Sequence, residues 1–450
     1  MSARGIIGLA VGLIAAVAIY WMAGRLEGDA PSVVVPEAVL LGSAGGSVTL
    51  HIQDDGTGLR RFTARLLHAA GSQSIFEESY PGGLLTGRVG NAQAREVNLE
   101  LDVDGLGLPD GPATLVVSVR DWSWRDGFAG NRSEISVPIT IDLRPPGLSV
   151  ASGLTYVYRG GSAAAIYRLE EDVSRDGVRV GDQLFRGYPH PSGEARLRVA
   201  LFSIPIDAAK TPEVYAFAVD AAGNLGERRF SAHVLERVFG TARIEIESAF
   251  VERVAAPLAD ANGLARGTPA ETFREVNEAL RARNEASIRD AIAESAPEPL
   301  FRGGFEQMRG SKVMSRFAEQ RTYTLDGTEI STTRHYGFDL ASTRQAAIQA
   351  AAAGVVVHAG PLGIYGQCVI VDHGLGLASL YGHLSEVATE VGARVERGDA
   401  LGRSGSTGLA AGDHLHFAIL VGEHYVDPLE WWDPRWVRSH VEVRLEPSTR

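Results

Sequence analysis

Hydrophobic residues form one long run at the start of the chain and many short, alternating runs after it. The long run, residues 6–23, is almost wholly apolar and is long enough to span a bilayer as a helix. Tyr20 and Trp21 near its end are aromatic residues of the kind that favour a membrane interface. We therefore expect residues 1–31 to be an uncleaved anchor, with a cleaved signal segment as the alternative. In either case the rest of the chain is exported, and an anchor makes it a single-pass protein of the inner (cytoplasmic) membrane with periplasmic domains.

Short runs that alternate with period two continue over residues 32–143, and turn-forming residues separate them. Clear examples are 47–52 (SVTLHI), 114–119 (TLVVSV) and 135–141 (ISVPITI). Such alternation is typical of strands that have one buried face. About a hundred residues of this kind predict a β-sandwich of immunoglobulin-like shape.

A weak repeat of this first module follows in residues 144–238. In the first module a strand ends at Asp121 and a Gly-Asn turn ending at Asn131 precedes the next strand. The same pattern recurs with Asp220 and Asn224. The repeat predicts a second β-sandwich in tandem with the first. Neither module gathers titratable residues at ligand spacing, so we expect spacers or docking surfaces rather than catalytic domains.

The pattern changes to helical periodicity in residues 239–310. Thr268 is followed by a proline and, three residues on, by Glu271, which is a typical helix start. Apolar residues then recur at helical spacing, and Asn284 is expected to cap a second short helix. We predict a helical linker that serves packing only. Whether residues 268–294 also form a lid over a site stays open.

The last domain is predicted over residues 311–437, followed by a tail at 438–450, and is again rich in strands. Runs such as 354–358 (GVVVH) and 368–372 (CVIVD) lie between glycine-rich turns. The chain as a whole is thus expected to be mostly β. Eight of the 12 histidines lie from His335 onward. That concentration makes this domain the place to search for a metal site.

Composition narrows the classes of function. The 450 residues carry a net charge of −12, which argues against a nucleic acid partner because phosphate binding needs a basic face. The chain has a single cysteine, Cys368, so no intrachain disulfide can form. This cysteine lies in an apolar run, where a buried, unreactive thiol is expected rather than a nucleophile.

An H-x-H triplet carries the strongest chemical signal. His414 and His416 flank a leucine at the start of an apolar run, and residues i and i+2 of a strand face the same side. His335 and Asp339 add a further imidazole and a carboxylate upstream. These ligand types suit zinc, and zinc with three protein ligands and one open position is a hydrolytic centre.

Four motifs in order resemble the M23 zinc metallopeptidases, the LytM or lysostaphin-type family. Residues 335–341 (HYGFDLA) resemble the H-x-G-x-D signature, and residues 381–384 (YGHL) resemble Y-x-H-L. Residues 405–408 (GSTG), continuing to 414–417 (HLHF), resemble G-x-T-G…H-x-H-F. One such motif alone is weak, whereas four in family order and spacing are strong.

The resemblance implies a β-rich M23 domain that binds zinc through His335, Asp339 and His416. It further implies that His383 and His414 are the catalytic pair, one assisting the water and the other stabilising the oxyanion. Which histidine does which is left open. A further oxyanion donor, frequent in the family, has no clear match in this chain.

Other residues near the motifs are expected to be structural. We interpret His373 as structural, His358 and His424 as non-ligands, and Asp413 as a turn residue rather than a support for a ligand. For Tyr365 and Tyr381 two roles stay open: each tyrosine could line the substrate groove of the domain or pack between strands.

The resemblance implies an exported zinc endopeptidase that hydrolyses amide bonds in the peptides or cross-links of peptidoglycan during cell-wall remodelling. One alternative is a non-catalytic LytM-type protein that activates another cell-wall hydrolase. A second is an adhesion or scaffolding protein whose sandwiches are the working part.

Overall fold

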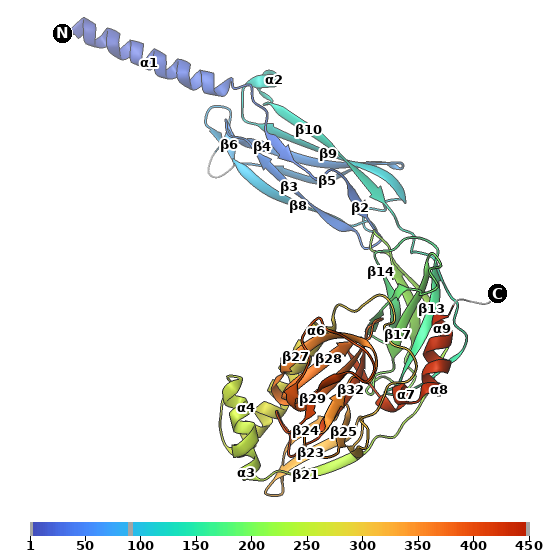
Figure 1. The fold of residues 1–450 in the computed structure, drawn as a ribbon. Coiled ribbons are helices and arrows are strands. Elements are labelled where there is room, and N and C mark those ends of the chain that lie inside the picture. Colours follow the sequence, from blue (N-terminus) through green and yellow to red (C-terminus); the bar gives the residue numbers. More distant parts are fainter. Residues whose placement is uncertain (1–2, 89–92, 447–450) are drawn as a thin grey trace. The chain divides into compact units, whose positions relative to one another are not determined.

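The computed structural model describes residues 3–88 and 93–446 and is mostly β (Figure 1). The chain divides into two compact units. One contains residues 1–145 with the turn 219–225, and the other contains residues 146–218 and 226–450.

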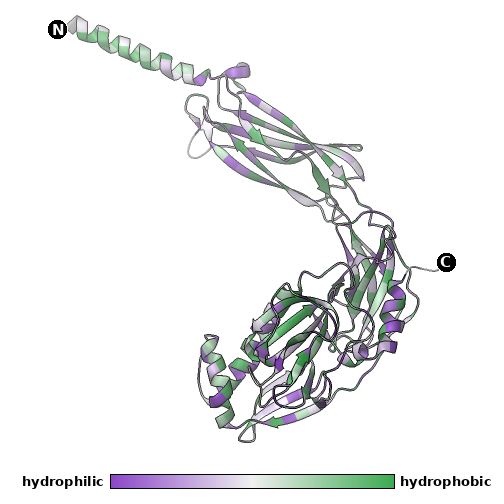
Figure 2. Cartoon of the chain, in the orientation of Figure 1, coloured by the Kyte–Doolittle hydropathy of each residue, from purple (hydrophilic) through white to green (hydrophobic). Residues whose placement is uncertain are grey.

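The first unit begins with helix α1 (Ala3–Arg25), whose segment Gly5–Arg25 is long and apolar enough to cross a membrane. Figure 2 shows hydrophobic residues along most of this helix. The residues from Gly5 to Ala23 are exposed. The helix is therefore a membrane anchor or a signal segment, in line with the expectation for residues 1–31.

Two larger sheets enclose one hydrophobic core in the described rest of the first unit. Leu50, Phe62 and Val117 are fully buried in this core, and strand β3 alternates buried and exposed residues as its sequence predicts. One sheet has the order β1 (Ser32–Val34), β3 (Gly46–Gln53), β8 (Ala94–Leu101). The other has the order β2 (Val39–Leu41), β10 (Arg132–Ile141), β9 (Gly111–Asp121), β4 (Leu59–His68), β5 (Gly71–Ser79). A short ribbon, β6 (Gly82–Gly83) with β7 (Gly87–Arg88), and helix α2 (Arg125–Phe128) complete the unit.

Strands of the second module form three further sheets. The first has the order β11 (Leu148–Val150), β13 (Ser162–Leu169), β17 (Leu197–Ser203), β16 (Tyr188–Pro189). The second has the order β15 (Gln183–Arg186), β14 (Arg175–Val180), β18 (Val214–Val219), β19 (Leu225–Arg229). The third pairs β12 (Thr155–Tyr158) with β20 (Ala232–Leu235). Tyr167, Phe185 and Phe202 are buried within this module. The immunoglobulin-like character of either module stays a prediction.

The sequence repeat corresponds to a repeated set of hydrogen bonds. The Asn131 side-chain amide donates to Oδ2 of Asp121 at 2.9 Å, and its backbone N–H donates to Oδ1 at 2.7 Å. Asn224 makes the same two bonds to Asp220, each at 2.9 Å. In both places the pair closes the turn between two strands, which is the physical reason for the recurring Asp and Gly-Asn.

The helical region consists of two antiparallel arms, and its limits differ from those predicted. The first arm joins α3 (Ser248–Phe250), a π-helical turn η1 (Val251–Ala255) and α4 (Ala256–Ala261); the second joins α5 (Pro269–Arg274), a π-helical turn η2 (Glu275–Leu280) and α6 (Arg281–Ile292).

Thr268 caps the second arm through a capping box with Glu271, as predicted. The prediction that Asn284 caps a separate helix is wrong, because helical φ and ψ angles continue through Leu280 and Arg281 and leave Asn284 inside α6.

The last domain is built on one large sheet and one small sheet. Figure 1 shows the central strands β25, β32, β29, β28 and β27 side by side. The large sheet has the order β22 (Lys312–Ser315), β25 (Phe338–Ala341), β32 (Leu415–Val421), β29 (Leu377–Val387), β28 (Gln367–Asp372), β27 (Gly354–Pro361), β30 (Arg394–Val395). Three further strands pair at its margins: β26 (Ala347–Gln349), β31 (Ala400–Ser404) and β33 (His424–Val426). A 3₁₀ turn, η3 (Gly363–Tyr365), precedes β28.

The small sheet draws on the segment that was predicted as a linker. Strand β21 (Thr241–Glu245) pairs in parallel with β23 (Gln320–Leu325), which pairs with β24 (Thr328–Arg334). The predicted helical linker therefore also supplies a strand. Ile246, directly after β21, packs in one core with Phe273 of the second arm.

The C-terminal segment is helical through Leu445, in the helices α7 (Pro428–Trp432), α8 (Pro434–Val437), η4 (Arg438–Glu442) and α9 (Val443–Leu445). Most of the segment predicted as a tail thus belongs to the folded domain, with Val441 fully buried. The carbonyl of Arg444 lies 2.8 Å from Nε2 of His190 in the second module. Residues 447–450 of that predicted tail lie outside the described residues.

Candidate metal centre

Strand register brings the sequence motifs together. In the sheet, Asp339 of β25 lies opposite His416 of β32, so that their side chains share a face. His416 also lies opposite Gly382 of β29, the residue before His383. His335 precedes β25, in the turn that follows β24.

A β-bulge directs His383 toward the same point. The pairing of β28 with β29 shifts register at Gly382 and His383, and His383 has φ +63°. A positive φ is uncommon for a residue with a side chain, and bulges often re-aim a side chain beside a functional site. The ring centroids of His383 and His414 are 4.8 Å apart as a result.

Three groups converge on one point. Nε2 of His335 lies 3.0 Å from Oδ1 of Asp339 and 3.0 Å from Nδ1 of His416, and the latter atom lies 3.1 Å from the same oxygen. All three ligand atoms lie within 4.8 Å of one another. His414 lies slightly farther away, with Nε2 3.6 Å from Oδ1 of Asp339. Two imidazole nitrogens and one carboxylate oxygen at this spacing form a donor set for a divalent metal.

Backbone carbonyls orient three of the four imidazoles. In His335, Nδ1 lies 3.1 Å from the carbonyl oxygen of Arg316. The corresponding distance is 2.9 Å between Nδ1 of His383 and the carbonyl oxygen of Thr407, and 2.8 Å between Nδ1 of His414 and the carbonyl oxygen of Gly412. A carbonyl accepts from the Nδ1–H tautomer, which leaves the lone pair of Nε2 directed at the site.

His416 has the opposite arrangement, with Nδ1 toward the site. Its Nε2 is buried and has no hydrogen-bond partner among the described residues. The ring of Tyr365 packs beside it, with centroids 5.5 Å apart. Nδ1 is therefore the nitrogen of His416 that is placed to bind a metal.

Sequence reasoning missed Arg321, which holds the carboxylate of Asp339 in place. Its Nη2 donates to Oδ2 of Asp339 at 2.8 Å and to Oγ of Ser315 at 2.7 Å, while Nε donates to Glu319 at 3.1 Å. These bonds leave Oδ1 of Asp339 free to face the histidines. Arg321 belongs to no motif, and only its place in a polar strand, β23, marks it in the sequence.

The surroundings of Asp339, His383 and His414 shift the pKa values of these three groups in different directions. Burial alone would raise the pKa of Asp339, but His335 and hydrogen bonds from His414 and His416 hold it well below the ordinary value. Burial, helped by the charges of His414 and His416, lowers the pKa of His383 to about 3. Burial opposes protonation of His414 as well, but the hydrogen bond to Asp339, the charge of Asp339 and the carbonyl of Gly412 together outweigh it and raise the pKa. The two histidines of the predicted catalytic pair are therefore inequivalent.

These groups open into a groove of about 420 Å³. Side chains of the small sheet, of the helical arms and of the turns around the motifs line the groove. They include Phe250, Phe273 and Arg281 of the helical arms, and Ile364, Tyr365 and Leu409 of the turns. The groove is thus lined in part by the second helical arm, which the sequence left open as a lid.

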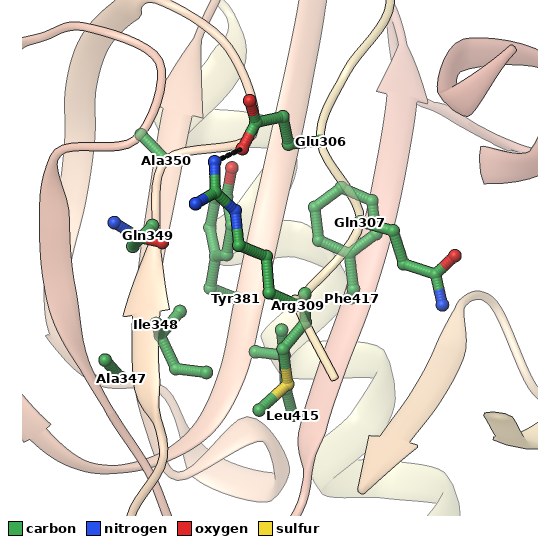
Figure 3. Close-up of a pocket in the computed structure, with 11 residues that line it drawn as sticks. Glu306, Gln307, Arg309, Ala347, Ile348, Gln349, Ala350, Tyr381, Leu415 and Phe417 are labelled. Atoms are coloured by element: carbon green, nitrogen blue, oxygen red, sulfur yellow. Dashed lines mark hydrogen bonds and ion pairs between the residues drawn. The ribbon is translucent and has the colours of Figure 1, made fainter. Parts of the chain in front are cut away.

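A second, smaller cavity lies on the other face of the sheet (Figure 3). Leu415 and Phe417, the neighbours of His416 in β32, line it together with Tyr381, because successive residues of a strand face opposite sides. Its volume is about 40 Å³, and its charged lining residues Glu306 and Arg309 pair with each other at 3.2 Å. The functional groups therefore gather on the groove face.

His373 and Asp413 make structural contacts of the kind that the sequence indicates. His373 is fully buried, with Nδ1 2.7 Å from the carbonyl of Ala353 and Nε2 2.7 Å from Ser379, so it is structural. Asp413 accepts hydrogen bonds from the backbone of Gln345 and from Ser404, which is a turn-stabilising role. In the described part of the chain, neither His358 nor His424 belongs to a group that could hold a metal.

The two tyrosines divide between groove and core. Tyr365 lines the groove, and its hydroxyl donates to Glu285 at 2.7 Å. The ring of Tyr381 packs against Phe417, and its hydroxyl accepts a bond from the backbone of Ala351. Cys368 is fully buried, and burial raises the pKa of its thiol, in line with an unreactive role.

Comparison with known proteins identifies the domain that carries this site. Residues 333–428 match the model of Peptidase family M23, so the chain contains an M23 peptidase domain at its C-terminal end. The DD-carboxypeptidase/endopeptidase Mpg of Neisseria meningitidis is 36% identical over 95 residues, which are 21% of this chain and 22% of Mpg. The peptidoglycan DD-endopeptidase ShyA of Vibrio cholerae is 34% identical over 87 residues, 19% of this chain and 20% of ShyA.

The chain thus spans about a fifth of the length of these curated relatives. Among solved structures, a putative peptidase M23 from Pseudomonas aeruginosa is 22% identical. The match covers 62% of this chain and 95% of that one, with a TM-score of 0.40.

Proposed function

We propose that this protein is an exported, membrane-associated zinc endopeptidase that hydrolyses amide bonds in peptidoglycan peptides or cross-links. The observation that carries the proposal is the convergence of His335, Asp339 and His416 in an open groove, with His383 and His414 beside them. The substrate class is supported by ShyA, whose name specifies endopeptidase activity on peptidoglycan, and by Mpg, whose name specifies endopeptidase activity.

His335, Asp339 and His416 would hold the zinc ion. Two neutral imidazoles and one carboxylate leave a net positive centre, which lowers the pKa of a bound water and polarises a carbonyl. The donor set fits this ion because zinc favours nitrogen and oxygen ligands in a four-coordinate site that keeps one position open. The buried, unpartnered Nε2 of His416 is consistent with ligation through Nδ1.

His383 and His414 would handle protons and the oxyanion. Both project their Nε2 atoms toward the site because backbone carbonyls hold Nδ1. His414 lies beside Asp339, which favours its charged form, whereas His383 is buried and favours the neutral form. A neutral imidazole can accept a proton from water, and a charged one can stabilise an oxyanion.

The N-terminal part would place this domain in the exported compartment. α1 is proposed to anchor the chain in the inner membrane, and the two β modules are proposed to be immunoglobulin-like spacers or docking surfaces. Such an arrangement suits a substrate in the cell wall, which lies outside the bilayer.

Digestion of purified sacculi by the full chain in detergent tests the proposal, with products identified by mass spectrometry and zinc by elemental analysis. We expect stoichiometric zinc and new free amines, both lost in His335→Ala and both retained in His358→Ala. Bound zinc without hydrolysis would favour a non-catalytic activator of another hydrolase. Absence of both would contradict the proposal.

A further inference from the structure

Two arginines line the groove, and they differ in their partners. Arg321 is engaged by Asp339, Glu319 and Ser315. Arg281, at the start of α6, forms no ion pair with any acidic residue in the described part of the chain. An unpaired cation in the same groove as the candidate metal ligands, in a protein of net charge −12, marks a place for an anionic group of a ligand.

The guanidinium of Arg281 is held in position but keeps free donors. Its Nε donates to the carbonyl of Asn277 at 3.0 Å, and Nη2 donates to the side chain of the same residue at 2.8 Å. A guanidinium has five N–H donors, so three remain, and two of them lie on the Nη1–Nη2 edge. This edge matches the two oxygens of a carboxylate.

Both acids within one turn of Arg281 on this arm have other partners. Glu278, three residues before it, accepts a hydrogen bond from the hydroxyl of Ser331 at 2.7 Å. Glu285 lies one turn beyond Arg281, where an ion pair would be expected on a helix surface. Its two carboxylate oxygens instead accept hydrogen bonds from the hydroxyls of Tyr365 and Tyr425, each at 2.7 Å. Arg281 therefore stays available to a ligand.

The position of Arg281 relative to the metal groups is set by a direct link between α6 and the groove wall. Oδ1 of Asn284, three residues on, accepts the backbone N–H of Ile364 at 2.9 Å. The adjacent Tyr365 packs on the ring of His416. Arg281, Tyr365 and His416 thus line one continuous groove.

The surroundings of Arg281 strengthen its attraction for an anion. Phe273, Ile364 and Leu409 line the same groove and exclude water when a peptide fills it. Ion pairs are stronger in such surroundings than on an open surface. A lone surface arginine would lack this advantage.

We propose that Arg281 binds a free carboxylate of the peptide substrate and so determines specificity for anionic over amidated peptides. The inference rests on the proposed peptidase function of the same site. The carboxylate could be the C-terminal one or one on the side chain of the cross-linking residue, and both present the same two oxygens.

Synthetic cross-linked peptides in three forms test this proposal on the full chain in detergent. One form has both carboxylates free, the second has a C-terminal amide, and the third has the side-chain carboxylate amidated. For the wild type we expect one of the two amidations to lower kcat/KM about tenfold or more, which identifies the source.

The variant Arg281→Gln is expected to cleave all three peptides with the same low kcat/KM, whereas Arg281→Lys keeps part of the preference. Arg283→Gln, an exposed neighbour whose Nη1 donates to the carbonyl of Asn262, is the matched control and is expected to behave as the wild type. Discrimination that survives in Arg281→Gln would overturn the proposal, as would indifference of the wild type to both amidations.

Direct binding separates this proposal from the proposed function. If the wild type cleaves none of the peptides, the peptidase function fails. Calorimetric binding of the same three peptides then decides the role of Arg281. Tighter binding of the anionic form, lost in Arg281→Gln, supports the role, and equal binding by both proteins refutes it.

Discussion

Arg321 donates a hydrogen bond from Nη2 to Oδ2 of Asp339 at 2.8 Å, on the side of the carboxylate opposite the histidines. Oδ1 of the same carboxylate faces His335 and His416 at 3.0 and 3.1 Å. The arginine thus leaves Asp339 one oxygen for a metal. Groups that orient ligands in this way commonly determine metal affinity nearly as strongly as the ligands do.

Substitution Arg321→Gln is expected to weaken zinc binding by about 10- to 100-fold, because the carboxylate loses its charged partner and its fixed orientation. Competition with a chromophoric chelator measures the change. Arg243→Gln on the adjacent strand β21, where the side chain is exposed, is the control and is expected to bind zinc normally. Unchanged affinity in Arg321→Gln would show that Asp339 is oriented by other contacts.

Removal of the metal is expected to lower the melting temperature of the wild type. A ligand that binds only the folded state stabilises it, by about 2.7 kcal/mol at a free concentration of 100 Kd. Thermal melts with and without a chelator measure the shift. In His416→Ala the chelator is expected to have no effect, and a shift of equal size in that variant would contradict ligation by His416.

Asn284→Ala is expected to loosen the groove wall without unfolding the domain. Asn284 is buried, and its Oδ1 accepts the N–H of Ile364, so truncation leaves a buried donor unpaired at a cost of about 1–3 kcal/mol. Hydrogen exchange of the Ile364 amide is expected to accelerate. Ser287→Ala, on an exposed face of α6, is the control. Unchanged exchange in Asn284→Ala would mean that the turn η3 is held by the sheet alone.

Local patterns predicted several features correctly. Period-two alternation predicts that His414 and His416 face one side, and both approach Asp339. The capping box at Thr268 is also local, since its partners are three residues apart. Features of this kind need only the chain direction and standard backbone geometry, which the sequence alone supplies.

Features that depend on distant contacts could not be predicted. The pairing of Arg321 with Asp339 exists only once two strands of different sheets lie together. Asn284 resembles a helix cap in the sequence, but its partner Ile364 is 80 residues away. The bulge that turns His383 depends on the register with β28, which no local signal specifies.

A buried acid links the second module to the helix α7. Glu430 is 5% exposed, and its Oε2 accepts the backbone N–H of Ser162 at 2.9 Å. Arg237 lies 3.7 Å away, and Asp427, itself paired with Arg237, lies nearby. Burial raises the pKa of Glu430 to about 8, and Asp427 adds to the rise, while Ser162 and Arg237 oppose it.

Stability is therefore expected to fall as pH rises from about 4.5 to about 8. In this window the unfolded chain has released the proton of Glu430 while the folded chain retains it, so folding binds a proton and weakens with pH. Below about pH 4.5 and above about pH 8, Glu430 does not change the dependence of the free energy of unfolding on pH. Glu430→Gln should flatten the dependence of melting temperature on pH between 5 and 8, because a glutamine imitates the neutral acid. Glu423→Gln, at an exposed acid, should retain the wild-type slope, and parallel curves for wild type and Glu430→Gln would show that Glu430 is ionised in the folded protein.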